Sequence, residues 1–388
     1  MRRPIVLLLF ATIFVAELGW SGVTPLLPSY AGRYGLSDVA TGMILMLSSF
    51  GILLVSLPAS ALSRRFAVRT LTLWGVGALA TGNLLVGLSH GYGLLLVGRG
   101  LFGIGLGTMW VTGAAWLHEA AGEDAPRALA ATTAVIGIGS LVGPSIVGDL
   151  AQRFSLGIPF VALGLLTGAT GLILVLVPST HGRVSEQSPP LREMVRAARA
   201  DHLMLTSLVL TLAASTMWMT VDLMVPFRLH AEGFSPREIG WAFSAASIAF
   251  AVASVLTARV AQRAATVRVA AIWTLLLGAG LSIVAAEAGV PATLVFLVIA
   301  GATSGVMISL TYPLGVTGAS QGGFSVAVVG ALLNMVWATS GILGPLSGGV
   351  VMQNVGDRPA FLALATISFA ASWWMWARRD RPRAPEPI

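Results

Sequence analysis

The chain contains no cysteine, its 23 basic residues include no lysine, and only 10% of its 388 residues are charged. The absence of cysteine excludes disulfide bonds and thiolate metal sites. A water-soluble domain carries roughly 25% charged residues, so this chain has too few to cover a surface in water. Instead, 56% of its residues are hydrophobic and its mean hydropathy is +0.85. We therefore expect most of its outer surface to face lipid.

Apolar runs long enough to cross a bilayer recur along the whole chain. One span needs about 20 mostly apolar residues. The sequence predicts six spans before and six after its longest polar stretch, residues 178–202. The predicted spans are 4–27, 39–61, 70–89, 92–117, 127–150, 157–177, 203–227, 238–260, 267–287, 291–312, 324–350 and 359–377.

These spans predict an all-α polytopic membrane protein of twelve transmembrane helices. We expect an N-terminal six-helix bundle at 1–177 and a cytoplasmic linker at 178–202. A second six-helix bundle with a short cytoplasmic tail is expected at 203–388. No segment between spans is long enough for a separate soluble domain.

The arginines predict the orientation of these spans. Basic residues are enriched in cytoplasmic loops. If both termini are cytoplasmic, the inner segments hold most of the arginines. The outer segments then hold only Arg33, Arg153, Arg228, Arg237 and Arg358. We therefore expect a multi-pass protein of the inner (plasma) membrane with both termini inside. Short basic clusters between apolar runs do not indicate nucleic-acid binding.

The two halves contain matching residues about 200 positions apart. The matched groups are Pro28 and Pro226, Arg69 and Arg268, Trp74 and Trp273, and Gly143-Pro144 and Gly344-Pro345. Six spans is an even number, so the second copy enters the membrane from the same side as the first. The sequence therefore predicts parallel repeats. Transporters built in this way bind substrate near the midplane, between the halves.

Three segments resemble signature elements of the major facilitator superfamily. The loop 62–69 matches the family's loop between spans two and three at Arg65, Phe66 and Arg69. It departs from that loop at Arg64, where the family has Asp, and at Ala67, where the family has Gly. The resemblance implies a gating role for Arg65 and Arg69, without the usual Asp.

Spans four and five carry the other two elements. Arg99 is followed by Gly103, Gly105 and Gly107, which is similar to the family's RxxxGxGxG element. In proton-driven members the arginine of that element is linked to proton coupling. Residues 139–148 are similar to the antiporter motif GxxxGPxxGG, with Val147 replacing one glycine. Residues 24–30 also fit the end of helix one in twelve-helix drug:proton antiporters, and the resemblance covers the whole chain.

The motif in span five has a physical rationale. Glycines four residues apart let helices approach closely, and a proline in a spanning helix permits a bend. A bent, closely packed helix suits an interface that opens and closes, although plain packing is an alternative. The candidate gating residues here and in the second copy are Gly139, Gly143, Pro144, Gly148, Gly344 and Pro345.

Ionisable residues inside spans are candidate functional residues by default. Glu17, Arg99 and Asp222 lie on spans one, four and seven, which line the cavity in the family that the chain resembles. We expect Glu17 to carry the proton under the influence of Arg99, and Asp222 to serve in coupling or cation binding. The alternative for Glu17 and Arg99 is a static ion pair. Asp149, at an outer helix end, is expected to be solvated.

Five uncharged residues complete the candidate cavity. Trp20, Trp110 and Trp218 are candidates for an aromatic wall that binds a flat or cationic compound, with core or lipid packing as the alternative. Asn83 and Asn334 are candidate cavity residues, with interhelical hydrogen bonding as the alternative.

These features favour a secondary active transporter, and in particular a proton-coupled exporter of small hydrophobic or cationic compounds. A carrier of a sugar, amino acid or other metabolite is the first alternative. A membrane sensor derived from a transporter is a second. The sequence has no metal-ligand cluster, Ser/His/Asp grouping or phosphate-binding loop, so we expect neither an enzyme nor a cofactor. The expected partners are a small molecule, protons and the bilayer, with the protein as a monomer.

Overall fold

The computed structural model describes residues 3–62, 65–177, 191–264, 266–286, 289–324 and 326–378. The regular structure within these ranges is helical, and no strand occurs in them. Twelve helical segments are long and apolar enough to cross a membrane, which confirms the predicted number of spans. All backbone hydrogen bonds of a helix stay inside the segment, which is what a lipid environment demands.

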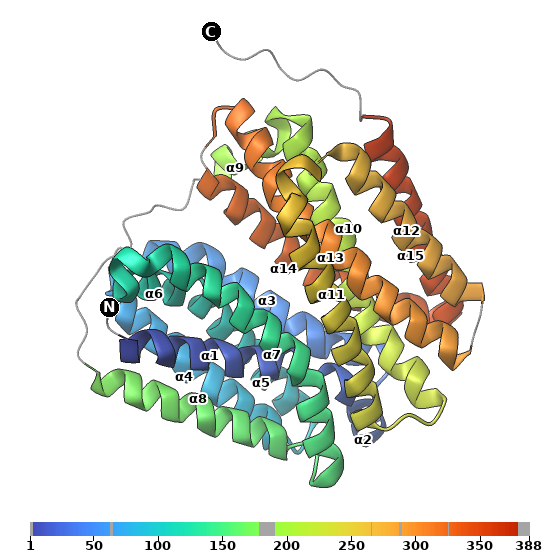
Figure 1. Ribbon diagram of the computed structural model, residues 1–388. Coiled ribbons are helices and arrows are strands. Elements are labelled where there is room, and N and C mark those ends of the chain that lie inside the picture. Colours follow the sequence, from blue (N-terminus) through green and yellow to red (C-terminus); the bar gives the residue numbers. More distant parts are fainter. Residues whose placement is uncertain are drawn as a thin grey trace. The chain divides into compact units, whose positions relative to one another are not determined.

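The helices form two compact units (Figure 1). The first contains Met1–Gln187 and Pro226–Ser244, and the second contains Ser188–Val225 and Ala245–Ile388. Helices α10 and α11 therefore contribute to both units. The division predicted along the chain, into six-helix bundles at 1–177 and 203–388, stays a prediction.

The first eight helices precede residue 178. They are α1 (Arg3–Ser21), α2 (Leu27–Tyr34), α3 (Asp38–Leu62), α4 (Val68–Gly87), α5 (Tyr92–Thr108), α6 (Ala114–Ala121), α7 (Ala125–Arg153) and α8 (Ile158–Leu176). Short helical turns, Thr24–Leu26 and Gly122–Asp124, join α1 to α2 and α6 to α7, and a π-helical turn, Met109–Gly113, joins α5 to α6.

Seven helices follow the polar stretch. They are α9 (Leu191–Ala200), α10 (His202–Ala231), α11 (Pro236–Ala264), α12 (Val267–Ala286), α13 (Val290–Gln321), α14 (Val326–Val355) and α15 (Asp357–Trp376). Span ten reaches Gln321, beyond its predicted end at 312, because helix continues through small polar residues that lower the hydropathy. Helix α9 lies in the predicted linker, and residues 178–190 of that linker are outside the described ranges.

In the first unit α5 packs against both α3 and α4, and α4 packs against α8 (Figure 1). Glycines make the close contact between α3 and α5. A side chain at Gly103 would collide with the backbone carbonyl of Ser48, and one at Gly107 would lie 2.9 Å from the Cα of Ile52. The RxxxGxGxG element of span four is thus a helix-packing face as well as a motif.

The second unit repeats this contact 198 residues later. Gly301 and Gly305 of α13 abut the backbone carbonyls of Ala246 and Phe250 on α11. The four residues are the counterparts of Gly103, Gly107, Ser48 and Ile52. The same interhelical contact occurs in both halves, which supports the parallel repeat read from the sequence.

The contact between α1 and α7 is also repeated, between α10 and α14. The glycine and the larger residue have changed helices between the two copies. In the first copy Val147 of α7 fills the space above Gly22. In the second copy the equivalent positions are Gly348 and Thr220, so the glycine has moved to the other helix. The valine that departs from the family motif is therefore accommodated by a glycine at the end of α1.

Candidate functional site

Glu17 lies in the contact between α1 and α7. Its side chain is 3% exposed, and Oε2 accepts a hydrogen bond from the Ser140 hydroxyl at 3.2 Å. Oε1 is buried and has no hydrogen-bond partner in the described structure. The Glu17 Cβ lies directly against Gly139, the first glycine of the motif in span five. The acid is therefore held on the helix that carries the antiporter-like motif.

Arg99 of α5 is buried and bonds to backbone carbonyls. Its Nη1 donates to the carbonyl of Gly19 on α1 at 3.1 Å, and its Nε donates to that of Ile44 on α3 at 3.3 Å. The guanidinium carbon lies 5.0 Å from the centre of the Phe102 ring. Nη2 is buried without a hydrogen-bond partner in the described structure. Arg99 of α5 thus joins its own helix to α1 and α3.

The static ion pair between Glu17 and Arg99, the alternative considered above, does not occur in the described structure, where each residue has other partners. Arg99 reaches α1 at Gly19, two residues beyond Glu17. Helical residues two apart point roughly 200° away from each other around the axis. Glu17 therefore faces α7, while Gly19 faces α5, and the influence of Arg99 on Glu17 stays a prediction.

Asn83 of α4 extends the polar group around Arg99. A side chain at Gly19 would lie 3.0 Å from Asn83 Oδ1, so the amide sits against the same turn of α1 that Arg99 contacts. Asn83 is fully buried, and neither of its amide atoms has a hydrogen-bond partner in the described structure. Asn334, by contrast, is exposed on α14. The two asparagines thus differ in burial, and they belong to different units.

The aromatic candidates lie on different helices. Trp20 is half-buried on α1, and half-buried Trp110 belongs to the π-helical turn within span four. Single π-turns inside helices are frequent at functional sites. Trp218 of α10 packs against Phe250 of α11 with ring centres 6.5 Å apart. Sequence reasoning missed Phe250, which its alignment with Ile52 did not mark as special.

Asp222 lies one turn beyond Trp218 on α10 and is half-buried. No hydrogen bond or ion pair to it occurs in the described structure. An acid within a span and without a countercharge is a candidate contact for a cation. The structure therefore places Asp222 beside the Trp218–Phe250 pair, in the second unit.

The motif of span five lies at two close helix–helix contacts in the first unit, which we call seams. Gly139 and Gly143 receive Glu17 and Ser21 of α1. At the far end of α7, Gly148 abuts the carbonyl of Pro236, and Gly240 of α11 abuts the carbonyl of Pro144. One helix thus contacts the candidate proton carrier on one side and the start of α11 on the other. In the second copy, a Cβ atom at Gly344 would lie 2.9 Å from the backbone carbonyl oxygen of Thr216.

The expectation that Asp149 is solvated is wrong. Asp149 follows Gly148 and binds two arginines, Arg153 at 2.8 Å and Arg237 of α11 at 3.2 Å. Its side chain is only 26% exposed. The α7–α11 seam is therefore closed by an ion pair next to a backbone contact.

Of the loop between spans two and three, Arg64 lies outside the described residues, whereas Arg65 and Arg69 are placed. Arg65 is exposed. Arg69 Nη2 donates to the carbonyls of Val175 at 2.6 Å and Val177 at 3.3 Å, at the end of α8. A cation there satisfies terminal carbonyls and complements the helix dipole. Arg69 is thus a cap of span six, whatever part it takes in gating.

Arg69→Gln is expected to lower the free energy of unfolding by about 1–2 kcal/mol, because the terminal carbonyls of α8 lose a charged donor. Arg65→Gln is the matched control and is expected to change it by less than about 0.5 kcal/mol. The measurement is thermal unfolding in detergent, followed by intrinsic tryptophan fluorescence. Equal destabilisation by the two substitutions would refute the capping role of Arg69.

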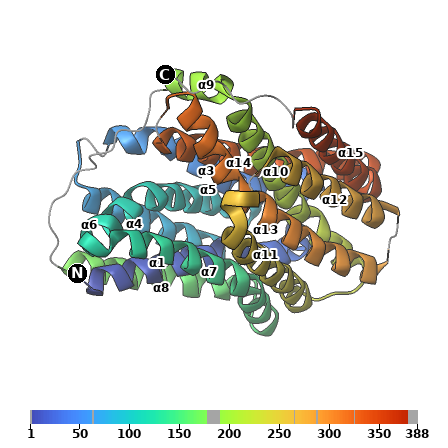
Figure 2. The ribbon, with the colours of Figure 1, turned by 45° about the horizontal axis from the view of Figure 1, so that its top comes forward.

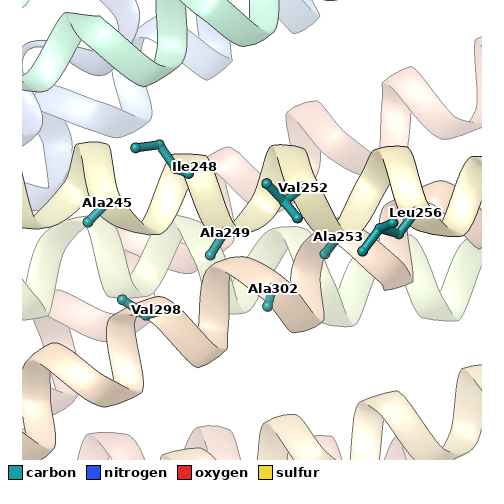
Figure 3. Close-up of a pocket in the computed structure, with 8 residues that line it drawn as sticks. All are labelled: Ala245, Ile248, Ala249, Val252, Ala253, Leu256, Val298 and Ala302. Atoms are coloured by element: carbon teal, nitrogen blue, oxygen red, sulfur yellow. The ribbon is translucent and has the colours of Figure 1, made fainter.

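A groove of about 560 Å³ lies between α11 and α13 in the second unit, and none of the predicted site residues lines it (Figure 3). Its wall is apolar, and Ala249 and Val298 contribute to it. Their counterparts in the first copy are Gly51 and Gly100, and a side chain at Gly51 would lie 2.5 Å from the Gly100 carbonyl. The groove of the second copy thus lies where Ala249 and Val298 replace the two glycines that bring the helices together in the first copy.

Comparison with known proteins agrees with this architecture. The family model of the Major Facilitator Superfamily matches residues 9–235 and 208–388, which together span almost the whole chain. The chain belongs to the major facilitator superfamily. It is therefore a multi-pass membrane transporter and not an enzyme.

Individual relatives are distant. The chain is 24% identical to the putative transporter AraJ of Escherichia coli, over all of this chain and 98% of that protein. It is 23% identical to multidrug resistance protein 2 of Bacillus subtilis, over 66% of each chain. Its fold matches the inward-facing, occupied structure of a bacterial homologue of the human lysosomal transporter Spinster. That match has a TM-score of 0.77 and 15% identity, over 97% of each chain. Within the superfamily, the similarity to the multidrug resistance protein means that this chain resembles the drug:proton antiporter branch.

Proposed function

We propose that this transporter exports small hydrophobic or cationic compounds in exchange for protons. The observation that carries the proposal is the setting of Glu17, which is buried and, among the described residues, has one oxygen without a hydrogen-bond partner and no ion pair with an arginine. A charged carboxylate is costly at such a place, and proton uptake removes the charge. Its hydrogen bond to Ser140 ties that event to α7.

The second support is the contact between Glu17 and the motif of span five. Gly139 lies against the Cβ of Glu17, and Ser140 of the same helix bonds its carboxyl group, so a change in that group would act on α7. The same helix meets α11 at Gly148. We propose that protonation of Glu17 shifts α7 and so changes the seam with α11, which couples the proton to alternating access.

The third support concerns the cargo. Asp222, near the Trp218–Phe250 pair, offers a carboxylate next to aromatic faces. This chemistry suits a compound with one positive charge and a flat apolar body. The name of the similar Bacillus protein, a multidrug resistance protein, points the same way. We further propose that the protein acts as a monomer in the plasma membrane with both termini cytoplasmic.

The test is transport by the purified protein in proteoliposomes that contain a pH-sensitive dye. A proton gradient is imposed, and a panel of lipophilic cations is added one at a time. We expect proton movement only when a transported compound is present. Uptake of a sugar or an amino acid that ignores the gradient would instead identify a metabolite facilitator and overturn the efflux proposal.

A further inference from the structure

Helix α9 lies at the membrane boundary because of its connection to the next span. Only Asp201 separates α9 from α10, whose spanning segment begins at His202. The Asp201 carboxylate accepts a hydrogen bond from the backbone N–H of Leu203 at 2.6 Å and lies 3.5 Å from Nδ1 of His202. The junction is thus held by side-chain contacts, and the end of α9 stays where α10 enters the membrane.

One face of α9 is docked on the second unit. Ala197 is 1% exposed and belongs to an apolar cluster formed by the ends of three spans. The cluster residues contributed by α10, α13 and α14 are Met204, Ala319, Val328, Val329 and Leu332. Figure 2 shows α9 beside the ends of α10 and α14. Helix α9 is therefore a fixed part of one membrane face of this unit.

The opposite face of α9 is basic. Arg192, Arg196 and Arg199 follow the spacing i, i+4, i+7, so with Val195 they share a roughly 100° arc of the helix. All four side chains are exposed, and Val195 is 45% exposed. No ion pair or hydrogen bond to the three arginines occurs in the described structure. Three guanidinium groups at a membrane boundary thus lack a countercharge.

We propose that this basic face of α9 (Arg192, Val195, Arg196 and Arg199) binds the phosphate headgroups of anionic phospholipids. The planar guanidinium donates two parallel hydrogen bonds to phosphate oxygens. An apolar residue among basic ones is typical of helices that lie in the headgroup region, where Val195 contacts the upper acyl chain. A soluble acidic protein is the less suitable occupant, because the junction at Asp201 keeps α9 at headgroup level. The site is independent of which compound is transported.

The absence of cysteine makes a clean test possible. A single cysteine introduced by Val195→Cys is labelled with bimane in the full-length protein, which is placed in phosphatidylcholine vesicles. Quenching of the bimane fluorescence is then measured with equal amounts of phosphatidylglycerol or phosphatidylcholine, each carrying a spin label close to its headgroup. One basic residue near an anionic surface favours it by roughly fivefold, so we expect quenching by phosphatidylglycerol to be at least about threefold stronger.

Two triple variants distinguish the effect of this site from a general effect of positive charge on the protein. In R192Q/R196Q/R199Q the preference for phosphatidylglycerol is expected to disappear. In R33Q/R127Q/R358Q, which removes the same charge from other exposed positions, the preference is expected to remain. Equal quenching by the two lipids in labelled Val195→Cys with its arginines intact, or no quenching by either lipid, would overturn the proposal. Loss of the preference in sodium phosphate but not in sodium chloride of equal ionic strength would support recognition of the phosphate group itself.

Discussion

Glu17→Gln is expected to reduce compound-driven proton movement in proteoliposomes to the level of protein-free vesicles, with the protein still folded. Glutamine has nearly the same shape and still accepts the hydrogen bond from Ser140, which spans 3.2 Å in the native protein. It cannot take up or release a proton in the relevant pH range. The substitution therefore removes the proposed carrier chemistry while keeping the contact with α7.

Two further variants make this prediction specific. Glu232→Gln changes an exposed acid between α10 and α11 and is expected to leave proton movement unchanged. Ser140→Ala keeps the acid but removes its hydrogen bond, so proton movement is expected to persist with a shifted pH profile. Full coupled flux in Glu17→Gln would show that Glu17 is a packing residue. The superfamily assignment would stand, and the carrier would have to be sought elsewhere, first at Asp222.

Gly148→Leu is expected to slow transport at least about fivefold in a protein that still folds. Gly148 lies against the carbonyl of Pro236, so any side chain there holds α7 and α11 apart. Overpacking of this kind costs about 1–3 kcal/mol, enough to displace an equilibrium between two transporter states by roughly fivefold or more. If closing this seam is one step of the cycle, turnover falls at least about fivefold.

The seam itself can be measured, since its ion pair joins Asp149 to Arg237 at 3.2 Å. With Asp149→Cys and Arg237→Cys, the otherwise cysteine-free chain forms a disulfide only when α7 and α11 meet. We expect rapid cross-linking in this background and slow cross-linking after Gly148→Leu. Gly137→Leu is the control on the same helix, because a side chain there meets nothing within 4 Å. Normal turnover of Gly148→Leu would exclude closure of the seam from the transport cycle.

The environment of Arg99 gives the arginine of the RxxxGxGxG element a structural role. Its guanidinium holds carbonyls of α1 and α3, and Asn83 lies against the same turn of α1. Buried polar groups are normally hydrogen-bonded, yet Arg99 Nη2 and both amide atoms of Asn83 have no partner in the described structure.

The sequence by itself determined the class of protein, the number of spans and the repeat. The thickness of the bilayer sets the length of every span, and hydropathy is a local property that needs no knowledge of neighbours. The glycine patterns at 103 and 301 could likewise be read as packing faces, since small residues let helices approach. All twelve spans were therefore predictable, with errors only at their ends.

Tertiary structure alone decided which side chains meet. Glu17 and Arg99 are both candidates from the sequence, but successive helical residues point about 100° apart, so two positions along α1 separate a face toward α7 from one toward α5. The bond between Glu17 and Ser140, the pairing of Asp149 with Arg237 and the cap of α8 by Arg69 depend on which helices are neighbours. Helix α9 was missed because a short polar helix has no hydropathy signal, and its stability comes from docking Ala197 on other helices.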